Sequence, residues 1–361
     1  MEKLEIIGGK KLQGSINISG SKNASLPILA ATILVNKVTL NNIPQVKDID
    51  TMTELLTSLG SKIYINKNKK KIKIHNYKSN KKVAKYKYVK TMRAGILVLG
   101  SLLSKFGKAK VSLPGGCAIG LRPVNLHIEA LKKMGVKIKI IEGYIYATAN
   151  NGLKGAKISF PKISVGATEN LIIAACKAKG RTILSNCAIE PEVKDLSNFL
   201  IKLGCKIKWL GKRKVQIDGV KNLKNINYNI MFDRIEAVTY MIAAAATNGR
   251  VSIKNIQPKI IDKEILLLKK IGVKIIEKKN KITIISSKNL KGINIKTSPY
   301  PGFPTDLQAQ LMVLMCKAKN QSIIRENIFE NRFMHVSELN RMGADIIVKG
   351  RKAIINGNKK L

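Results

Sequence analysis

The stretch LPGGCAIGLRPVNL, from Leu113 to Leu126, brings a thiol and a guanidinium together in one glycine-rich segment. Its first proline and its glycines predict an irregular surface loop that can close over a ligand. Cys117 lies near the tip of this predicted loop. A thiol with an ordinary pKa of roughly 8.5 is mostly protonated at neutral pH yet gives up its proton readily. An inert thiol in an ordinary turn is the alternative, and the rest of the chain decides between the two.

The high positive net charge of the chain is compatible with several classes of anionic partner. Among its 361 residues, 66 are Lys or Arg and 22 are Asp or Glu, which gives a formal net charge of +44. Such a chain could bind nucleic acid, a membrane surface or small anions. The lysines are scattered over nearly every polar stretch, aromatic residues make up only 5%, and no RRM, KH or helix-turn-helix pattern occurs. Nucleic-acid binding therefore stays an alternative and not the main expectation.

Cysteine usage and apolar runs limit the class of protein. The five cysteines form no CxxC pair and leave an odd one, so we expect neither a disulfide framework nor a structural metal site. Cys176, Cys205 and Cys316 lie in apolar segments and are predicted core residues. The apolar runs are too short to span a bilayer, and the first ten residues lack a signal-peptide core. We therefore expect a soluble, cytoplasmic protein.

An internal repeat of about 70 residues organises the chain. A motif of a long apolar residue, Gly, any residue, Lys or Asp, and Ile recurs with glycine spacings of 75, 69, 68 and 71. Its glycines are Gly60, Gly135, Gly204, Gly272 and Gly343. A second register marks the ends of apolar helices, where a left-handed cap is expected, at Asn36, Gly107, Gly180, Gly249 and Asn320. Because two independent series of positions recur with the same period, we do not attribute the repeat to chance.

Each repeat predicts the order βαβαββ. Alternating strands are expected at residues 15–19, 156–160, 227–232 and 292–297, and apolar helices at 167–178 and 306–317. Strands that need cover and helices with an apolar face imply copies packed around a shared helical core. Five copies are present and a sixth begins near Leu361. With three copies to a domain, we expect an exposed apolar surface on the second domain, and self-association through it.

Seven motifs resemble one known family along the chain from Leu12 onward. They are SGSKNASLPIL, KTMRAG, PGGCAIGLRPVNLHI, SVGATEN, FDRIEAVTYMIAAA, FPTDLQAQ and ENRFMHV. The chain resembles the bacterial UDP-N-acetylglucosamine 1-carboxyvinyltransferase family, the enolpyruvyl transferases of peptidoglycan synthesis within the EPSP synthase superfamily. The resemblance implies an α/β (α+β) fold, a two-domain inside-out α/β barrel of six βαβαββ repeats, here with the sixth mostly absent. It implies a first domain at residues 22–230 and a second at 1–21 and 231–361.

The resemblance also implies a reaction and the residues that perform it. The family transfers the enolpyruvyl group of phosphoenolpyruvate to the 3'-hydroxyl of UDP-N-acetylglucosamine by addition and elimination, with release of phosphate and without metal or cofactor. Cys117 would be the acid, and Asp306 the base for the hydroxyl. Lys22, Asn23 and Arg122 would bind the phosphate of phosphoenolpyruvate.

A further set of residues would bind the sugar nucleotide, by resemblance. It comprises Arg93, Arg122, Pro123, Val124, Asn125, Leu126, Lys162, Ser164, Val165, Gly166, Asp306, Ile328 and Arg332. The SVG segment precedes a predicted helix, so its N–H groups could meet the diphosphate. Asn125 stands where the family usually has aspartate, beside the uridine pocket, and so loses a charge there. His127 and His335 are expected as hydrogen-bonding neighbours.

Other interpretations remain open for several of these residues. Thr305 or Asp306 could cap a helix, and Lys162 could be one more solvated lysine. Asp233, Glu236, Glu190 and, as an alternative to a role in binding, Arg332 are expected to support the cleft or the contacts between domains. The whole chain could also bind the UDP-sugar without turnover, and the joint presence of Cys117, Arg122, Lys22 and Asp306 favours the active transferase over that alternative.

Overall fold

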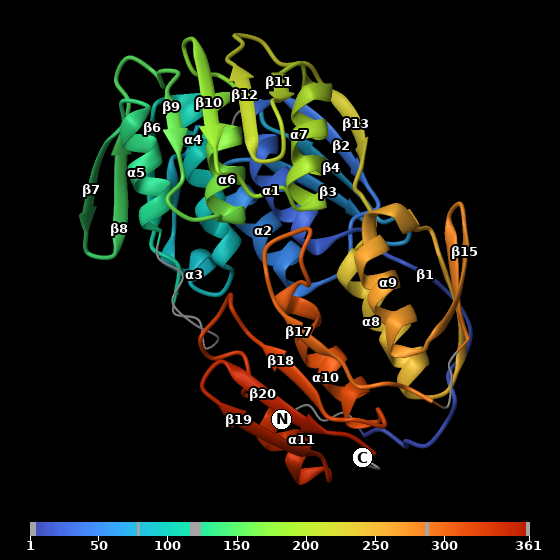
Figure 1. Cartoon of the computed structure of the whole chain (residues 1–361). Coiled ribbons are helices and arrows are strands. Elements are labelled where there is room, and N and C mark those ends of the chain that lie inside the picture. The colour runs from blue at the N-terminus through green and yellow to red at the C-terminus, as the bar shows by residue number, and fades with distance from the viewer. Residues whose placement is uncertain (1–4, 78–79, 116–123, 286–288, 359–361) are drawn as a thin grey trace. The chain divides into compact units, whose positions relative to one another are not determined.

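The computed structural model describes residues 5–77, 80–115, 124–285 and 289–358 (Figure 1). Cys117, Arg122 and Pro123 lie outside the described residues, so their assignments stay predictions. The chain divides into two compact units. The larger unit contains the described residues 19–115 and 124–231, and the smaller unit contains 5–18 and 232–358.

The larger unit contains three consecutive repeats. The first comprises α1 (Lys22–Ala31), η1 (Thr32–Leu34), β2 (Lys37–Asn41), α2 (Lys47–Ser58), β3 (Lys62–Asn66) and β4 (Lys71–His75). The second comprises β5 (Val83–Ala84), α3 (Tyr86–Val89), η2 (Arg93–Leu97), α4 (Val98–Phe106), β6 (Lys108–Ser112), α5 (Asn125–Lys133), β7 (Lys137–Ile141) and β8 (Tyr144–Thr148). The third comprises β9 (Lys157–Ser159), α6 (Val165–Ala175), β10 (Arg181–Ser185), α7 (Pro191–Leu203), β11 (Lys206–Trp209) and β12 (Lys214–Asp218), and β13 (Ile226–Asn229) follows it.

The smaller unit contains two further repeats and the first strand of the chain, β1 (Gln13–Asn17). One repeat comprises α8 (Arg234–Ala246), β14 (Arg250–Lys254), η3 (Pro258–Ile261), α9 (Asp262–Ile271), β15 (Lys274–Lys278) and β16 (Lys281–Ile285). The other comprises β17 (Asn294–Lys296), η4 (Thr305–Leu307), α10 (Gln308–Cys316), β18 (Ser322–Arg325), α11 (Val336–Arg341), β19 (Asp345–Lys349) and β20 (Lys352–Asn356).

Among the described residues the strands form five four-stranded sheets of one design. Their orders are β13-β2-β4-β3, β5-β6-β8-β7, β9-β10-β12-β11, β1-β14-β16-β15 and β17-β18-β20-β19. In each sheet the first pair is parallel and the other two pairs are antiparallel. The predicted α/β class and the βαβαββ repeat are therefore confirmed.

Two of the sheets begin with a strand from a distant part of the chain. β1 pairs in parallel with β14, with Gln13 opposite Arg250. β13 pairs in parallel with β2, with Ile226 opposite Val38. The opening strand of the first repeat thus completes a sheet of the smaller unit, and a strand from the end of the third repeat completes the first sheet of the larger unit.

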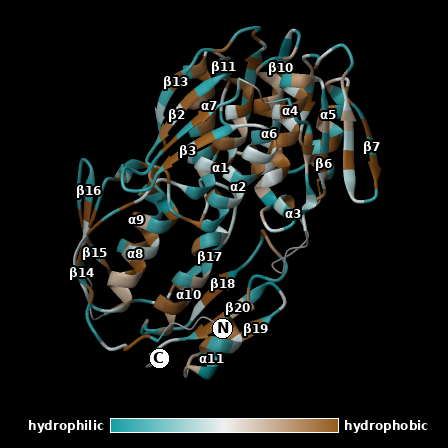
Figure 2. Ribbon diagram, turned by 180° about the vertical axis from the view of Figure 1, so that it is seen from behind, coloured by the Kyte–Doolittle hydropathy of each residue, from teal (hydrophilic) through white to brown (hydrophobic). Residues whose placement is uncertain are grey.

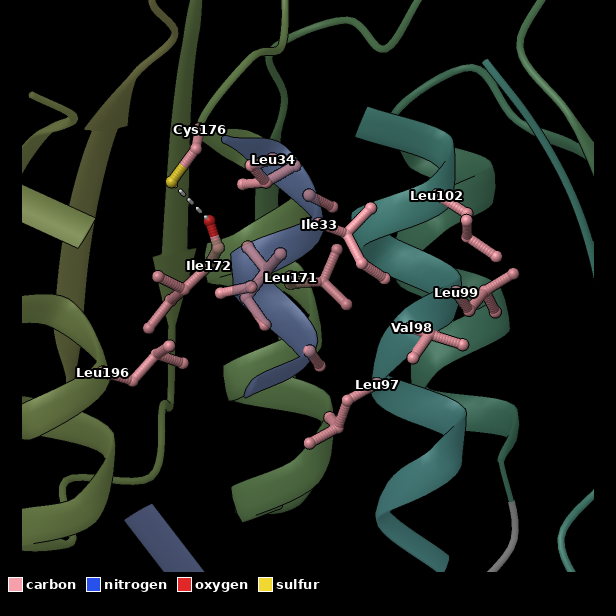
Figure 3. Close-up of a cluster of buried hydrophobic side chains, with 14 of the residues drawn as sticks. Ile33, Leu34, Leu97, Val98, Leu99, Leu102, Leu171, Ile172, Cys176 and Leu196 are labelled. Atoms are coloured by element: carbon pink, nitrogen blue, oxygen red, sulfur yellow. Dashed lines mark hydrogen bonds between the residues drawn. The ribbon is translucent and has the colours of Figure 1, made fainter. Parts of the chain in front are cut away.

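The first helices of the repeats form the core of the larger unit. In α1 every residue from Ala24 to Ala31 is buried, and in α6 every residue from Ala167 to Ala175. Figure 3 shows side chains of α4, α6 and α7 meeting beside those of η1, and Cys176 Sγ donating a hydrogen bond to the Ile172 carbonyl at 3.3 Å. The second helices α2, α5 and α7 have exposed polar residues on one side and cover the sheets. Figure 2 shows hydrophilic colour on most turns between strands.

The left-handed positions agree only in part with those expected at the helix ends. All five glycines of the repeat motif have positive φ, between 85° and 108°. Of the five positions expected at helix ends, Gly107 and Gly180 have positive φ, at 67° and 91°, and Gly107 is a left-handed C-cap. α6 already ends at its C-cap Cys176, before Gly180. Gly249 has an ordinary φ, and its role is close approach, because a Cβ there would lie 2.2 Å from the Leu12 carbonyl oxygen.

The prediction that three of the cysteines lie in the core is confirmed. Cys176, Cys205 and Cys316 are buried core residues, and Cys187 is buried as well. Burial raises the pKa of the Cys187 thiol to about 12, which keeps it protonated. No helix in the described ranges is long and apolar enough to cross a membrane.

Replacing Leu171 by Ala tests the helical core. Leu171 is fully buried on α6, so the truncation should remove about 2–5 kcal/mol from the free energy of unfolding, through lost burial and the cavity left behind. Urea unfolding followed by circular dichroism measures the loss. Ile201→Ala on the exposed side of α7 is the control and should cost much less. Equal costs for the two variants would contradict this packing.

Candidate functional site

Lys22 and Asn23 form the first turn of α1. Ser21 is the N-cap, and its Oγ accepts the N–H of Ala24 at 3.3 Å. Lys22 Nζ lies 3.2 Å from Asp48 Oδ2, and the lysine side chain is 44% exposed. An exposed ion pair of this kind contributes little to stability. A phosphate could therefore take the place of Asp48 at modest cost.

The N-terminus of α6 can bind an anion. Ser164 is its N-cap and accepts the N–H of Ala167 at 3.3 Å. The N–H groups of Val165 and Gly166 belong to the first turn, where an α-helix supplies no carbonyl to accept them. The first turn of α6 contains no acidic residue, and Lys162 is exposed two residues before the cap. The helix dipole and these N–H groups together favour a negative ligand.

Several predicted ligand-binding residues meet around His127. Asn125 and Leu126 begin α5, and His127 follows them, buried to 6% exposure. α5 and η2 both pack against α6. Arg93 opens η2, and its positive charge acts on the His127 ring. The structure thus brings together Arg93, the start of α5 and Gly166.

His127 is held as a neutral side chain. Burial, together with the positive charge of the nearby Arg93, lowers the pKa of its imidazole to about 4. Its Nδ1 lies 2.9 Å from Asn170 Nδ2 on α6. The sequence had not singled out Asn170, because an asparagine within an apolar helix carries no distinctive spacing.

In the smaller unit, Asp306 and Arg332 form an ion pair. Arg332 Nη2 donates to Asp306 Oδ1 at 2.7 Å, and the Asp306 side chain is 44% exposed. The Arg332 guanidinium also lies over the Phe329 ring, with 5.7 Å between Cζ and the ring centroid. The capping alternative is wrong, because the N-caps of η4 and α10 are Pro304 and Leu307, without a side-chain cap bond. The Asp306 carboxylate is therefore oriented by a cation beside solvent.

A buried carboxylate, Glu326, links the segments that carry Asp306 and Ile328. Glu326 is 1% exposed, and its Oε1 accepts from Thr297 Oγ1 at 2.8 Å and from the N–H groups of Ile328 and Phe329 at 2.8 and 3.1 Å. Its Oε2 accepts from Thr305 Oγ1 at 2.8 Å. Sequence reasoning missed this residue. An acid directly after a strand, in a chain with so few acids, was the available signal.

Two other acidic residues contribute to the structure of the helices that carry them. Asp233 caps α8 by accepting the N–H groups of Ile235 and Glu236, at 2.9 and 3.0 Å. Glu169 is buried on α6, and burial together with the charges of Glu192 and Glu190 raises the pKa of its carboxyl. Glu169 is therefore expected to be protonated at neutral pH.

Comparisons with known proteins agree on one family. A family model described as "EPSP synthase (3-phosphoshikimate 1-carboxyvinyltransferase)" matches residues 6–361. The chain is 67% identical over 361 residues to the UDP-N-acetylglucosamine 1-carboxyvinyltransferase of Pelagibacter ubique (strain HTCC1062), covering 100% of this chain and 86% of that protein. It is 52% identical over 365 residues to the protein of that name from Geotalea uraniireducens (strain Rf4), with 100% and 86% covered.

Solved structures show the same fold. The enolpyruvyl transferase NikO from Streptomyces tendae aligns with a TM-score of 0.86 and 20% identity, over 98% of this chain and 83% of that one. EPSP synthase from Acinetobacter baumannii aligns with a TM-score of 0.73 and 20% identity, over 98% and 83%. At these identities the likeness establishes the architecture alone.

Replacing Glu326 by Gln tests the link within the smaller unit. The amide has one acceptor oxygen and no charge, so four charge-assisted bonds become weaker and the Thr305 bond must reverse. We expect a loss of about 1–3 kcal/mol in the free energy of unfolding, measured by urea titration. Glu338→Gln, which removes an exposed carboxylate of the same unit, is the control and should change stability by no more than about 0.5 kcal/mol. Unchanged stability in Glu326→Gln would refute the proposed link.

The buried, neutral His127 predicts a pH dependence of stability. The unfolded chain takes up a proton near the ordinary histidine pKa of about 6.5, whereas the folded ring does so only near about 4. Stability is therefore fully present above the unfolded pKa and falls as the pH drops from about 6.5 towards 4, by about 3 kcal/mol in total. Unfolding of wild type and of His127→Gln across this range measures the effect. The same slope in both proteins would contradict it.

Proposed function

Because this chain belongs to the EPSP synthase family and, within it, to the UDP-N-acetylglucosamine 1-carboxyvinyltransferases, we propose that it transfers the enolpyruvyl group of phosphoenolpyruvate to the 3'-hydroxyl of UDP-N-acetylglucosamine. The observation that carries the proposal is the 67% identity over the whole chain to a protein of that name. The reaction releases phosphate and is a step of peptidoglycan synthesis.

The chemistry consists of an addition and an elimination. In the addition, the sugar hydroxyl oxygen bonds to C2 of phosphoenolpyruvate, its proton passes to a base, and C3 takes a proton from an acid to become a methyl group. In the elimination, the bond from C2 to the phosphate oxygen breaks, and C3 loses a proton to restore the double bond. The net products are the enolpyruvyl ether and phosphate, so no oxidant or reductant is needed.

We assign the proton transfers to Cys117 and Asp306. Cys117 supplies the proton to C3, as the family resemblance implies. Asp306 takes the hydroxyl proton, and the Arg332 contact at 2.7 Å supports this assignment because it fixes one carboxylate oxygen. The exposure of the Asp306 side chain leaves room for a substrate hydroxyl.

Cations and helix N-termini would bind the anionic substrates. Lys22 and Asn23, in the first turn of α1, are proposed to hold the phosphate of phosphoenolpyruvate together with Arg122. The geometry of the α6 N-terminus supports binding of the diphosphate by Ser164, Val165 and Gly166, with Lys162 beside it.

The remaining sugar-nucleotide contacts come from several segments. Arg93 and the start of α5 are proposed to contact the nucleotide, as are Ile328 and Arg332. The exposed Asn125 would present an amide to the uracil. Pro123, Val124 and Leu126 belong to the same proposed uridine site.

The domain boundaries and the cellular role extend the proposal. We propose domains at residues 22–230 and at 1–21 with 231–361. The two compact units, which divide near these positions, support these bounds. So do β1, which pairs with β14 of the smaller unit, and β13, which pairs with β2 of the larger unit. We also propose that the protein acts in the cytoplasm, in cell wall biogenesis and hence in cell shape and cell division. The shared name of the relatives supports the peptidoglycan role. Self-association stays a prediction.

Phosphate release from UDP-N-acetylglucosamine and phosphoenolpyruvate tests the function. Wild type should release phosphate, and Cys117→Ala should lose about 100-fold or more in rate because C3 loses its proton donor. Cys187→Ala, which removes a buried thiol instead, is the matched control and should retain release. Equal release by Cys117→Ala would refute the role of Cys117. Binding of the UDP-sugar by wild type without phosphate release would establish the binding-only alternative.

A further inference from the structure

A chain of two hydrogen bonds ends on the ring of His127. The backbone N–H of Gly100 on α4 donates to Asn170 Oδ1 at 2.8 Å. On its other side, Asn170 Nδ2 lies 2.9 Å from His127 Nδ1. Asn170 is fully buried, and Gly100 allows the approach, since a Cβ there would lie 2.3 Å from Asn170 Oδ1. The amide is therefore held at both ends inside the core.

This arrangement fixes the position of the imidazole proton. A backbone N–H can only donate, so the Asn170 atom that faces Gly100 must be the carbonyl oxygen. The atom that faces His127 is then the NH₂ group, which also can only donate. His127 Nδ1 must accept, and a neutral ring carries its proton on Nε2.

The protonated edge of the ring lies at the N-terminus of α6. A Cβ built on Gly166 would lie 3.5 Å from His127 Cε1 and 3.6 Å from Nε2. Gly166 is in the first turn of an 11-residue helix whose N-cap is Ser164. The Nε2 edge of the ring therefore lies beside the first turn of α6.

We infer that Asn170 is a positioning residue, which holds His127 in the Nε2–H tautomer so that this N–H donates to an anionic oxygen of the bound sugar nucleotide. The inference rests on the proposed function and deepens it. A neutral donor suits this place because Arg93 already supplies a positive charge next to the ring.

The groups around the His127 ring favour its neutral form. Arg93 of η2 is the charged group that acts on His127. The α6 residues that face the ring, Gly166 and Asn170, do not titrate. Lys137 and Lys139, on the neighbouring β7, are exposed to solvent. Burial and Arg93 thus both favour the neutral ring.

Replacing Asn170 by Asp reverses the direction of the hydrogen bond to His127 with almost no change in the shape of the side chain. A carboxylate only accepts, so it takes the Gly100 N–H on one oxygen and requires His127 to donate from Nδ1. The neutral ring then loses its Nε2 proton. A carboxylate beside the ring also favours the doubly protonated form, which has both protons. Asn198→Asp, the same change at an exposed position of α7, is the matched control.

Nitrogen NMR of protein labelled at histidine reads the tautomer directly. The chain has 3 histidines, so the spectrum is sparse, and His127→Gln assigns the signals. Wild type and Asn198→Asp should show an unprotonated Nδ1 and a protonated Nε2 for His127 from neutral pH down to about pH 5. Asn170→Asp should show a protonated Nδ1. A protonated Nδ1 in wild type would overturn the inference.

Binding of UDP-N-acetylglucosamine tests the second half of the inference. The ligand should shift the Nε2–H signal of wild type, and Asn170→Asp should bind about tenfold or more weakly at high pH, since a bond to a charged group is lost. Its affinity should recover as the pH falls and Nε2 regains a proton, whereas a purely structural defect would not recover. UDP-sugar binding that leaves Nε2–H unshifted would overturn this inference alone. No binding by wild type at all would overturn the proposed function, and this inference with it.

Discussion

The burial of the first helix of each repeat is the constraint on which the candidate site depends. α1, α4 and α6 are apolar on nearly every side and pack against one another, so their axes cannot shift without opening the core. The candidate residues lie where these helices begin. Lys22 and Asn23 open α1, Arg93 opens the turn that leads into α4, and Ser164 caps α6. Packing of apolar side chains thus fixes the positions of polar groups that lie at the edge of the core.

The repeat gives this placement a common physical reason. A helix N-terminus carries unsatisfied N–H groups and a partial positive charge, and each repeat presents one such terminus after its first strand. In the smaller unit the same position carries Asp233 on α8 and Asp306 just before α10. The larger unit therefore supplies cations and N–H groups at these positions, and the smaller unit supplies carboxylates.

The sequence was sufficient to predict the repeats and the order of elements, because apolar periodicity and the recurring glycines are local signals. It placed the strand of residues 156–160 within a residue or two of the observed Lys157–Ser159, and the helix of residues 167–178 within a few residues of α6. Contacts between distant residues could not be predicted in this way. The four bonds of Glu326 come from residues that three segments supply, and the two bonds of Asn170 join α4, α5 and α6. The left-handed cap expected at Gly249 was misplaced for a related reason, since the close backbone approach there depends on the distant Leu12.

The central claim is that the chain transfers an enolpyruvyl group by addition and elimination. Deuterium incorporation measures this most directly: UDP-N-acetylglucosamine and phosphoenolpyruvate react in D₂O, and mass spectrometry reads the vinyl group of the product. An exchangeable thiol proton becomes a deuteron in D₂O, so the addition should place deuterium on C3, and the elimination should leave deuterium in the product methylene. Product without deuterium in its vinyl group would contradict the account, as would the absence of product.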